Sequence, residues 1–269
     1  MSFRLLAALY ASCLLTFISS CAMNPTSPSA AAIAELAPTG KLRAGINFQN
    51  VMLTSLGPNG EQGGVAVDLV HELAKRLNVP LEITVFKSAG SLAEAARAKT
   101  WDVSVLGIEP ERAKEIAFAP PLTEIEASYM VPAGSPIKSN DEVDRPGVRV
   151  VVGAKSAYDL YLERTLKNAT RVPIAGSGAA VKEFATGKYE VLAGLKAQLT
   201  EAAPTMPGMR ILPGAFNVVR HTAGTLPGRP AGSAYLHAFV EDVKASGLLN
   251  QWIAKSGVKG LAAAPAAAK

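Results

Sequence analysis

Residues 99–107 read Lys-Thr-Trp-Asp-Val-Ser-Val-Leu-Gly, and residues 187–194 read Gly-Lys-Tyr-Glu-Val-Leu-Ala-Gly. In both stretches a helix end, an aromatic residue and an acidic residue precede a short apolar run that closes on glycine. An apolar run bounded in this way predicts a buried strand of a parallel sheet. The repeated pattern favours two similar α/β lobes in one chain, although βαβ units also resemble one another without any further kinship.

Strand and helix patterns alternate on either side of both stretches. In residues 64–78, Val67, Val70, Leu73 and Leu77 share one face of a helix. We predict strands at 41–46, 81–86, 102–107, 148–153 and 190–194, and helices at 64–78, 92–99, 157–167 and 178–186. This order predicts an α/β fold with two open, mostly parallel sheets and helices on both faces.

Two segments are expected to cross between the lobes, at residues 129–137 and 216–219. Two crossings make the lobes discontinuous in sequence and join them by a two-strand hinge. We therefore predict lobe 1 from residues 40–130 together with 218–258, and lobe 2 from residues 131–217. The helix expected at 233–246, with Ser233 as its N-cap, completes lobe 1. A small ligand is expected in the cleft, outside the carboxyl ends of the strands.

The N-terminal residues predict export and lipid attachment. Arg4 precedes an apolar stretch at 5–18 that is too short for a comfortable membrane span. The sequence Ile18-Ser-Ser-Cys21 resembles a bacterial lipobox. This resemblance implies that residues 1–20 are a signal peptide and that Cys21 receives the lipid, which would anchor the protein to a membrane in the periplasm. The alternative is an ordinary signal peptide with a chance cysteine.

Low-complexity sequence is expected to flank the folded body. Residues 21–39 are rich in Ala, Pro and Ser and predict a flexible tether. Residues 259–269 predict a disordered tail.

Composition excludes several classes of function. The 269 residues are 49% hydrophobic, which suffices for two domains with cores. The net charge of +5 comes from scattered basic residues, so nucleic acid is a poor candidate partner. Both cysteines, Cys13 and Cys21, precede the body, which therefore has no disulfide and depends on packing. No metal-ligand cluster and no glycine-rich phosphate loop stands out, so we expect neither a metal nor a cofactor.

An arginine follows the strand predicted at 102–107, in the sequence Pro110-Glu-Arg112-Ala-Lys114. Pro110 has a fixed φ that suits the first position of a short helical turn. Arg112 at the end of a strand is either a solvated surface residue or the head of an anion site.

Several motifs together, in order and spacing, resemble family 3 bacterial extracellular solute-binding proteins over about residues 40–257. They are Lys41-Leu-Arg-Ala-Gly45, Gly64-Val-Ala-Val-Asp-Leu69, Trp101-Asp-Val103 and Pro110-Glu-Arg112-Ala-Lys114. The resemblance implies the two-lobed type II periplasmic binding protein fold and a monomer that delivers a small anionic or zwitterionic solute, of the polar amino acid type, to an ABC permease.

The resemblance also implies a ligand site. Arg112 matches the arginine that grips the ligand carboxylate, because a guanidinium offers two parallel donors. In the opposite lobe Ser156 begins a helix after Gly153, and N–H groups at a helix start suit an anion. Ser156 with Asp159 also fits a simple capping box, which needs no ligand. The other positions expected to line the site are Asn47, Phe48, Gly107, Ala157 and Leu195.

The departures from the family pattern concern the ligand's amine. Asn47 stands where the family has an acidic residue, and Leu195 stands where it has the aspartate that holds the α-ammonium. Burying an ammonium without a counter-charge is costly. We therefore expect a ligand with a carboxylate or similar anion and no amine read by an acid. Lys196 either pairs with a second anionic group or is solvated.

Two other functions compete with solute binding. Some proteins of this fold are periplasmic dehydratases, and for such an enzyme Glu109 would be the best acid. The histidines 71, 221 and 237 are far apart in sequence and no catalytic motif is present, so we expect no enzyme and no catalytic residue. The third hypothesis is a lipoprotein that senses its ligand, which the sequence does not separate from transport.

Overall fold

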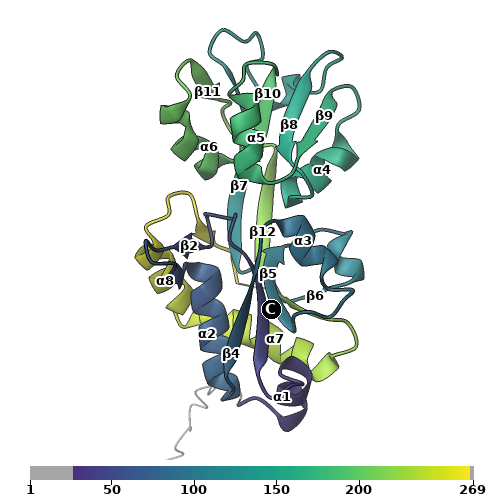
Figure 1. Ribbon diagram of the computed structural model, residues 1–269, viewed down its shortest axis with the longest axis vertical. Coiled ribbons are helices and arrows are strands. Elements are labelled where there is room, and N and C mark those ends of the chain that lie inside the picture. The colour runs from purple at the N-terminus through teal and green to yellow at the C-terminus, as the bar shows by residue number, and fades with distance from the viewer. Residues whose placement is uncertain (1–26, 267–269) are drawn as a thin grey trace, which may run out of the picture.

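The computed structural model describes residues 27–266. The predicted signal peptide, the lipidation site at Cys21 and residues 267–269 lie outside the described residues. Figure 1 shows two lobes stacked along the long axis of the molecule, with strands β7 (Thr123–Pro132) and β12 (Asn217–Thr225) running from one to the other.

Lobe 1 is built from the chain before β7 and after β12. Its strands are β1 (Leu42–Asn47), β2 (Ser55–Leu56), β3 (Gln62–Gly63), β4 (Leu81–Phe86), β5 (Val103–Gly107), β6 (Ala117–Phe118) and β13 (Ala262–Ala263). Its helices are α1 (Ala30–Leu36), α2 (Val65–Leu77), α3 (Ala89–Glu94), the 3-10 turn Arg112–Lys114, α7 (Pro230–Ala245) and α8 (Leu248–Ser256).

Lobe 2 lies between the two crossing strands. Its strands are β8 (Arg149–Gly153), β9 (Thr170–Ile174), β10 (Val191–Leu195) and β11 (Met209–Ile211). Its helices are α4 (Ala157–Thr165), α5 (Ser177–Phe184), α6 (Lys196–Ala202) and the 3-10 turns Asn140–Glu142 and Ala203–Thr205.

The main sheet is continuous through both lobes, in the order β4-β1-β5-β12-β7-β10-β8-β9. The pairs β1–β4, β1–β5, β8–β9 and β8–β10 are parallel, as the alternating pattern predicts. The pairs of β12 with β5 and β7, and of β7 with β10, are antiparallel. The predicted α/β architecture is confirmed, but the two expected sheets are hydrogen-bonded to each other through β7 and β12.

The amphipathic helix α2 illustrates how the core of lobe 1 forms. Its apolar stripe, including Val70 and Leu73, is buried, and its polar face is exposed or half-buried. Asn78 in the left-handed conformation ends the helix, and strand β4 follows over the range predicted. No helix within residues 27–266 is long and apolar enough to cross a membrane.

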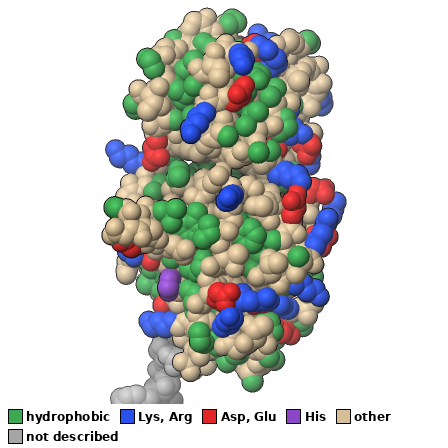
Figure 2. All heavy atoms as spheres, in the orientation of Figure 1, with side chains coloured by type: hydrophobic (Ala, Val, Ile, Leu, Met, Phe, Trp, Pro, Cys, Tyr) green, Lys and Arg blue, Asp and Glu red, His purple; other side chains and the backbone are tan. Residues whose placement is uncertain are grey.

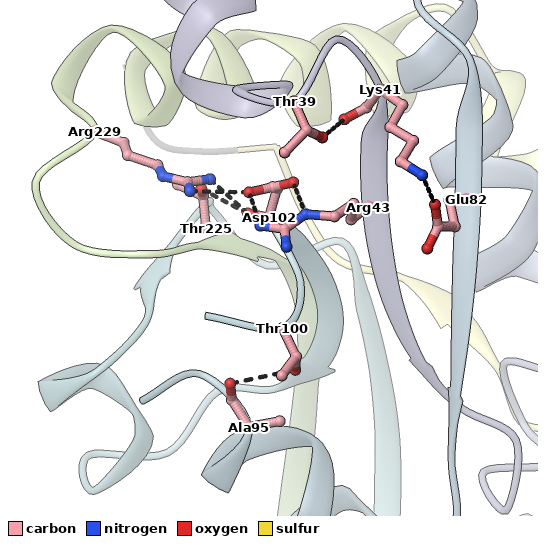
Figure 3. A network of polar contacts seen from close by, with 9 residues as sticks. All are labelled: Thr39, Lys41, Arg43, Glu82, Ala95, Thr100, Asp102, Thr225 and Arg229. Atoms are coloured by element: carbon pink, nitrogen blue, oxygen red, sulfur yellow. Dashed lines mark hydrogen bonds and ion pairs between the residues drawn. The ribbon is translucent and has the colours of Figure 1, made fainter. Parts of the chain in front are cut away.

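A buried ionic network fixes the start of β5 (Figure 3). The Asp102 carboxylate is fully buried and accepts hydrogen bonds from Arg43 Nε at 2.8 Å and from Arg229 Nη2 at 2.9 Å. The Thr225 hydroxyl donates to the Asp102 carbonyl oxygen at 2.8 Å. The bond to Asp102 raises the pKa of Arg43. The network connects β1, β5, β12 and the loop before α7. It therefore fixes the direction in which β5 runs and the position of its far end.

The predicted flexible tether differs from the structure in its second half. Residues 30–36 form helix α1, which Ser29 caps by accepting from the Ala32 N–H at 3.1 Å. Leu36 is fully buried, and the Glu35 carboxylate accepts from the Gly232 N–H of α7 at 2.7 Å. A helix this short depends on tertiary packing, and α7 supplies it.

The C-terminal segment also differs from the predicted disordered tail. Strand β13 pairs with β7 at Ala262 and Ala263, and the Ala264 N–H donates to the Leu122 carbonyl at 2.8 Å. Backbone pairing of this kind needs no particular side chain, so composition does not reveal it. Helix α7 likewise begins at Pro230 rather than after Ser233, because proline suits the first turn of a helix.

Candidate functional site

A cavity of about 50 Å³ lies between the lobes, where the ends of β1 and β5 and the middle of β12 face the starts of α4 and α5. Of the residues that the sequence predicts for the site, the cavity is lined by Asn47, Gly107, Arg112, Ser156, Ala157 and Leu195. Phe48 is not among the lining residues and packs against the main hydrophobic core.

Arg112 lies inside the cleft and is only 5% exposed. Its Nη1 donates to the Gly107 carbonyl oxygen and its Nη2 to the Lys155 carbonyl oxygen, both at 2.8 Å. Burial lowers the pKa of Arg112 to about 10, so the side chain remains a cation at neutral pH. Within residues 27–266 it forms no ion pair with a carboxylate, and two of its five N–H groups are used.

Ser156 begins helix α4 as predicted. Its hydroxyl accepts from the Asp159 N–H at 3.1 Å, which confirms the N-cap. The Asp159 carboxylate accepts from the Lys155 N–H at 2.7 Å and from Arg171 Nη1 at 2.5 Å. These contacts fix the turn that carries the Lys155 carbonyl toward Arg112, with Lys155 at a positive φ of 54°.

Polar contacts join the lobes around this cavity. Besides the bond from Arg112, Arg164 Nη2 of α4 contacts the Glu109 carboxylate of lobe 1 at 2.6 Å, and Lys155 pairs with Glu94 of α3. Figure 2 shows acidic and basic side chains side by side at the level of the waist. The lobes are therefore in direct contact around the cavity, and we call this arrangement closed. The cavity of about 50 Å³ is small beside an apolar cavity of about 150 Å³ that holds one benzene.

His221 and Asn50 belong to the cavity wall but escape sequence reasoning. His221 is 6% exposed, and Asn50 Nδ2 lies 3.2 Å from its Nε2. Burial, with a contribution from the Arg112 charge, lowers the pKa of His221 to about 3. His221 comes from β12, more than a hundred residues after Arg112, so no local pattern indicates it. Asn50 gives a weak signal, because it belongs to the run Asn47-Phe-Gln-Asn50 at the end of the first strand, which is polar at three of its four positions.

Further polar residues missed by sequence reasoning complete the wall. Tyr158 shares a hydrogen bond of 2.8 Å with Ser177, and burial raises the pKa of the tyrosine. Gly176, with a positive φ of 94°, lets the Gln49 side chain of the other lobe approach, since a Cβ there would lie 2.6 Å from the amide oxygen. Gln198 and Ser88 also line the cavity.

The remaining candidates lie outside the cavity lining. The Glu109 carboxylate is buried and engaged by Arg164 rather than directed at a ligand. Lys196 pairs with Glu126 at 2.6 Å and borders a second cavity of about 870 Å³ beside α6 and the C-terminal segment. His71 and His237 are exposed.

The charge of the cavity wall is one-sided. Arg112 is its single charged side chain in the described part of the chain, and no aspartate or glutamate lines it. No group of three or more His, Cys, Asp or Glu side chains within residues 27–266 is placed to hold a metal ion.

Solved structures show which class of fold this is. The chain is similar to a mutant of ArgBP from T. maritima, with 22% identity, a TM-score of 0.70 and coverage of 84% of this chain and 99% of that one. For a solute receptor for L-cysteine of Neisseria gonorrhoeae the identity is 19%, the TM-score 0.74 and the coverage 85% and 95%. For the ancestral amino acid-binding protein AncCDT-1, a precursor of cyclohexadienyl dehydratase, the values are 21%, 0.70, and 83% and 98%. These likenesses define the periplasmic binding protein fold.

The family follows from the sequence model. Residues 42–257 match the model of the bacterial extracellular solute-binding proteins, family 3, and the chain belongs to that family. Comparison with curated protein sequences gives no significant match. The predicted family is thus confirmed. Because we expect no acidic residue that would hold the amine of a ligand, the ligand of this member has to be considered separately.

Proposed function

We propose that this chain is the periplasmic solute-binding component of an ABC-type importer, and that it binds a small carboxylate-bearing or amino-acid-like solute between its lobes. One observation carries the proposal: Arg112 is a buried cation in the cleft that forms no direct ion pair with a carboxylate within the described residues, although the charge of the buried Glu109 acts on it and partly offsets the lowering of its pKa by burial. A buried charge without an ionic partner is costly unless a ligand supplies one. Its three unused N–H groups are available to a ligand carboxylate.

The other assignments of ligand contacts rest on the cavity wall. Asn47 and Gly107 of lobe 1 border the site of the carboxylate from one side, and Ser156, Ala157 and Leu195 of lobe 2 border it from the other. We assign Phe48 a packing role instead. The proposal also includes attachment to the membrane through a lipid on Cys21, whose test is release of the protein by detergent but not by salt.

Binding calorimetry with the purified protein tests the proposal. Arg112→Ala would remove two charge-assisted hydrogen bonds of about 1.5–3 kcal/mol each, and it should therefore weaken binding of a carboxylate ligand by roughly 10²- to 10⁴-fold. The matched control is Arg97→Ala, which removes an arginine of the same lobe that is 75% exposed. Mass spectrometry of co-purifying solutes supplies the first ligands to test. Unchanged binding in a folded Arg112→Ala variant would refute the proposal.

A dehydratase-like enzyme is the second candidate, supported by the likeness to the precursor AncCDT-1. In that hypothesis Glu109 would act as the acid. Its ion pair with Arg164 instead supports a role in holding the lobes together. Turnover of a carboxylate substrate that is lost in Glu109→Gln would favour the enzyme. A ligand-sensing lipoprotein would use the same cleft, and neighbouring permease and ATPase genes would favour import.

A further inference from the structure

The register of the sheet aims His221 into the cleft. His221 lies directly opposite Gly107 in the antiparallel pair of β12 and β5, and directly opposed residues project to the same face of a sheet. A Cβ built at Gly107 would lie 2.9 Å from Ala157 Cβ and 3.3 Å from Arg112 Nη1. The side chain of His221 therefore projects from the same face of the sheet that Arg112 lies against. Both the imidazole and the guanidinium line the cavity.

The hydrogen bonds of Asn50 determine the tautomer of the imidazole. The Met52 N–H donates to Asn50 Oδ1 at 3.3 Å, which fixes the orientation of the amide. Asn50 Nδ2 then points at His221 Nε2, at 3.2 Å. An NH₂ group is a donor, so Nε2 must be the acceptor, and a neutral ring carries its proton on Nδ1.

The resulting Nδ1–H is a buried donor without a partner. Burial and the Arg112 charge keep the ring neutral, since they lower the pKa of His221 to about 3. Within the described residues Nδ1 has no hydrogen-bond partner, and His221 is more than nine-tenths buried. A buried donor without a partner is uncommon in folded proteins. A ligand that accepts the hydrogen bond would explain it. His221 lines the same cavity as Arg112, but Nδ1 itself has almost no accessible surface, so a ligand oxygen reaches it only after the surrounding side chains move.

We propose that His221 determines specificity by donating its Nδ1–H to an oxygen acceptor of the ligand, so that the site selects small 2-oxo or 2-hydroxy carboxylates over the corresponding amino acids. This inference rests on the proposed function and names the ligand class for the same cleft. A keto or hydroxyl oxygen accepts the bond, whereas an ammonium has only donors and would face both a donor and the Arg112 cation. Asn50 is the positioning residue, because it sets the tautomer.

The test is calorimetry with three probes of nearly equal size: pyruvate, lactate and alanine. In the wild type, pyruvate or lactate should bind at least about 10-fold more tightly than alanine. His221→Phe should weaken the oxygen-bearing probes by about 10- to 100-fold, the range expected for one buried hydrogen bond, and should reduce the preference over alanine to the part that the Arg112 charge supplies. His71→Phe, on an exposed face of α2, is the matched control.

Two further measurements keep the inference falsifiable if His221→Phe does not fold. Nitrogen-15 NMR of the His221 ring in the wild type should show Nδ1 protonated and Nε2 unprotonated. The reverse tautomer would overturn the inference. Asn50→Leu should reduce the preference for pyruvate or lactate over alanine. Equal loss for all three probes in His221→Phe, tighter binding of alanine than of both oxygen-bearing probes, or binding of none of them also overturns it. Failure of the proposed function is distinguishable, because only there does Arg112→Ala leave ligand binding intact.

Discussion

The ion pair between Glu109 and Arg164 should control how readily the cleft closes. Glu109 follows β5 in lobe 1, and Arg164 lies on α4 in lobe 2, with Nη2 and Oε2 2.6 Å apart. The two groups meet only when the lobes are together, so the pair stabilises the closed arrangement and contributes nothing to the open one. Glu109→Gln removes the charge while keeping the shape of the side chain.

The magnitude follows from the burial of the two partners. The Glu109 side chain is 6% exposed and that of Arg164 is 38% exposed. A hydrogen bond to a charged group contributes about 1.5–3 kcal/mol, and the exposure of Arg164 to solvent reduces this to about 1–2 kcal/mol. The closed arrangement should therefore lose roughly 5- to 30-fold in population relative to the open one.

Two assays measure the loss. If the ligand-free wild type is mainly closed, small-angle scattering without ligand should show a larger radius of gyration for Glu109→Gln than for the wild type. If the ligand-free wild type is instead mainly open, calorimetry should show that Glu109→Gln raises the dissociation constant of the ligand by up to about 5- to 30-fold. The reason is that the ligand then has to close the cleft. Glu111→Gln is the control, since Glu111 pairs with Lys114 on the exposed surface of one lobe.

A double-mutant cycle decides whether the two residues act through each other. Arg164→Gln alone should have a similar effect, and the double variant should be little worse than either single one. The reasoning is refuted if Glu109→Gln leaves both the radius of gyration and the dissociation constant unchanged, or if the two substitutions are additive.

Three further predictions concern stability. Asp102→Ala should lower the free energy of unfolding by about 3–5 kcal/mol in urea titrations, because it leaves two arginines of the buried network without their carboxylate; a loss below 1 kcal/mol would contradict this. Because the pKa of His221 falls from 6.5 to about 3 on folding, the unfolded chain takes up a proton that the folded chain refuses. The wild type should therefore lose stability relative to His221→Asn by about 1.4 kcal/mol per pH unit between pH 6 and 4, and parallel pH profiles would disprove the burial argument. Gly45→Ala should cost about 1–3 kcal/mol by overpacking, since a Cβ there would lie 2.9 Å from Trp101 Cδ1, and a thermal melt that matches the wild type would show that the ring can move.

The regular elements could be predicted from sequence because their signals are local. The period of apolar residues in α2 and the bounded apolar run of β4 suffice to place both. Helix α1 had a local signal too, since Ser29 is a good N-cap and alanine is the best helix former. The prediction of a tether is wrong for this segment, because the burial of α1 depends on α7, some 200 residues later in the chain.

The residues of the site also divide into those with a local sequence signal and those without one. Arg112 and Ser156 lie in turns that directly follow strands, so their positions at the cleft could be expected from sequence. His221 reaches the cleft only because β12 pairs with β5 in one particular register. Pairing between strands so distant in sequence is set by the whole sheet, and a shift by one residue would turn the imidazole to the other face.

In the proposed function, the charge of the cleft should limit the choice of ligand more sharply than the shape of the cleft does. Arg112 is a fixed cation, and Leu195 stands in the wall where the resemblance places an aspartate. An ammonium about 4 Å from the guanidinium would be repelled by about 4 kcal/mol at an effective dielectric constant of 20, with no carboxylate in the described wall to offset it. A carboxylate at the same distance would gain a similar amount. Replacing an amine by an oxygen on an unchanged carbon skeleton therefore removes the repulsion and leaves the attraction, so ligands that differ only in that atom isolate the electrostatic contribution from the fit.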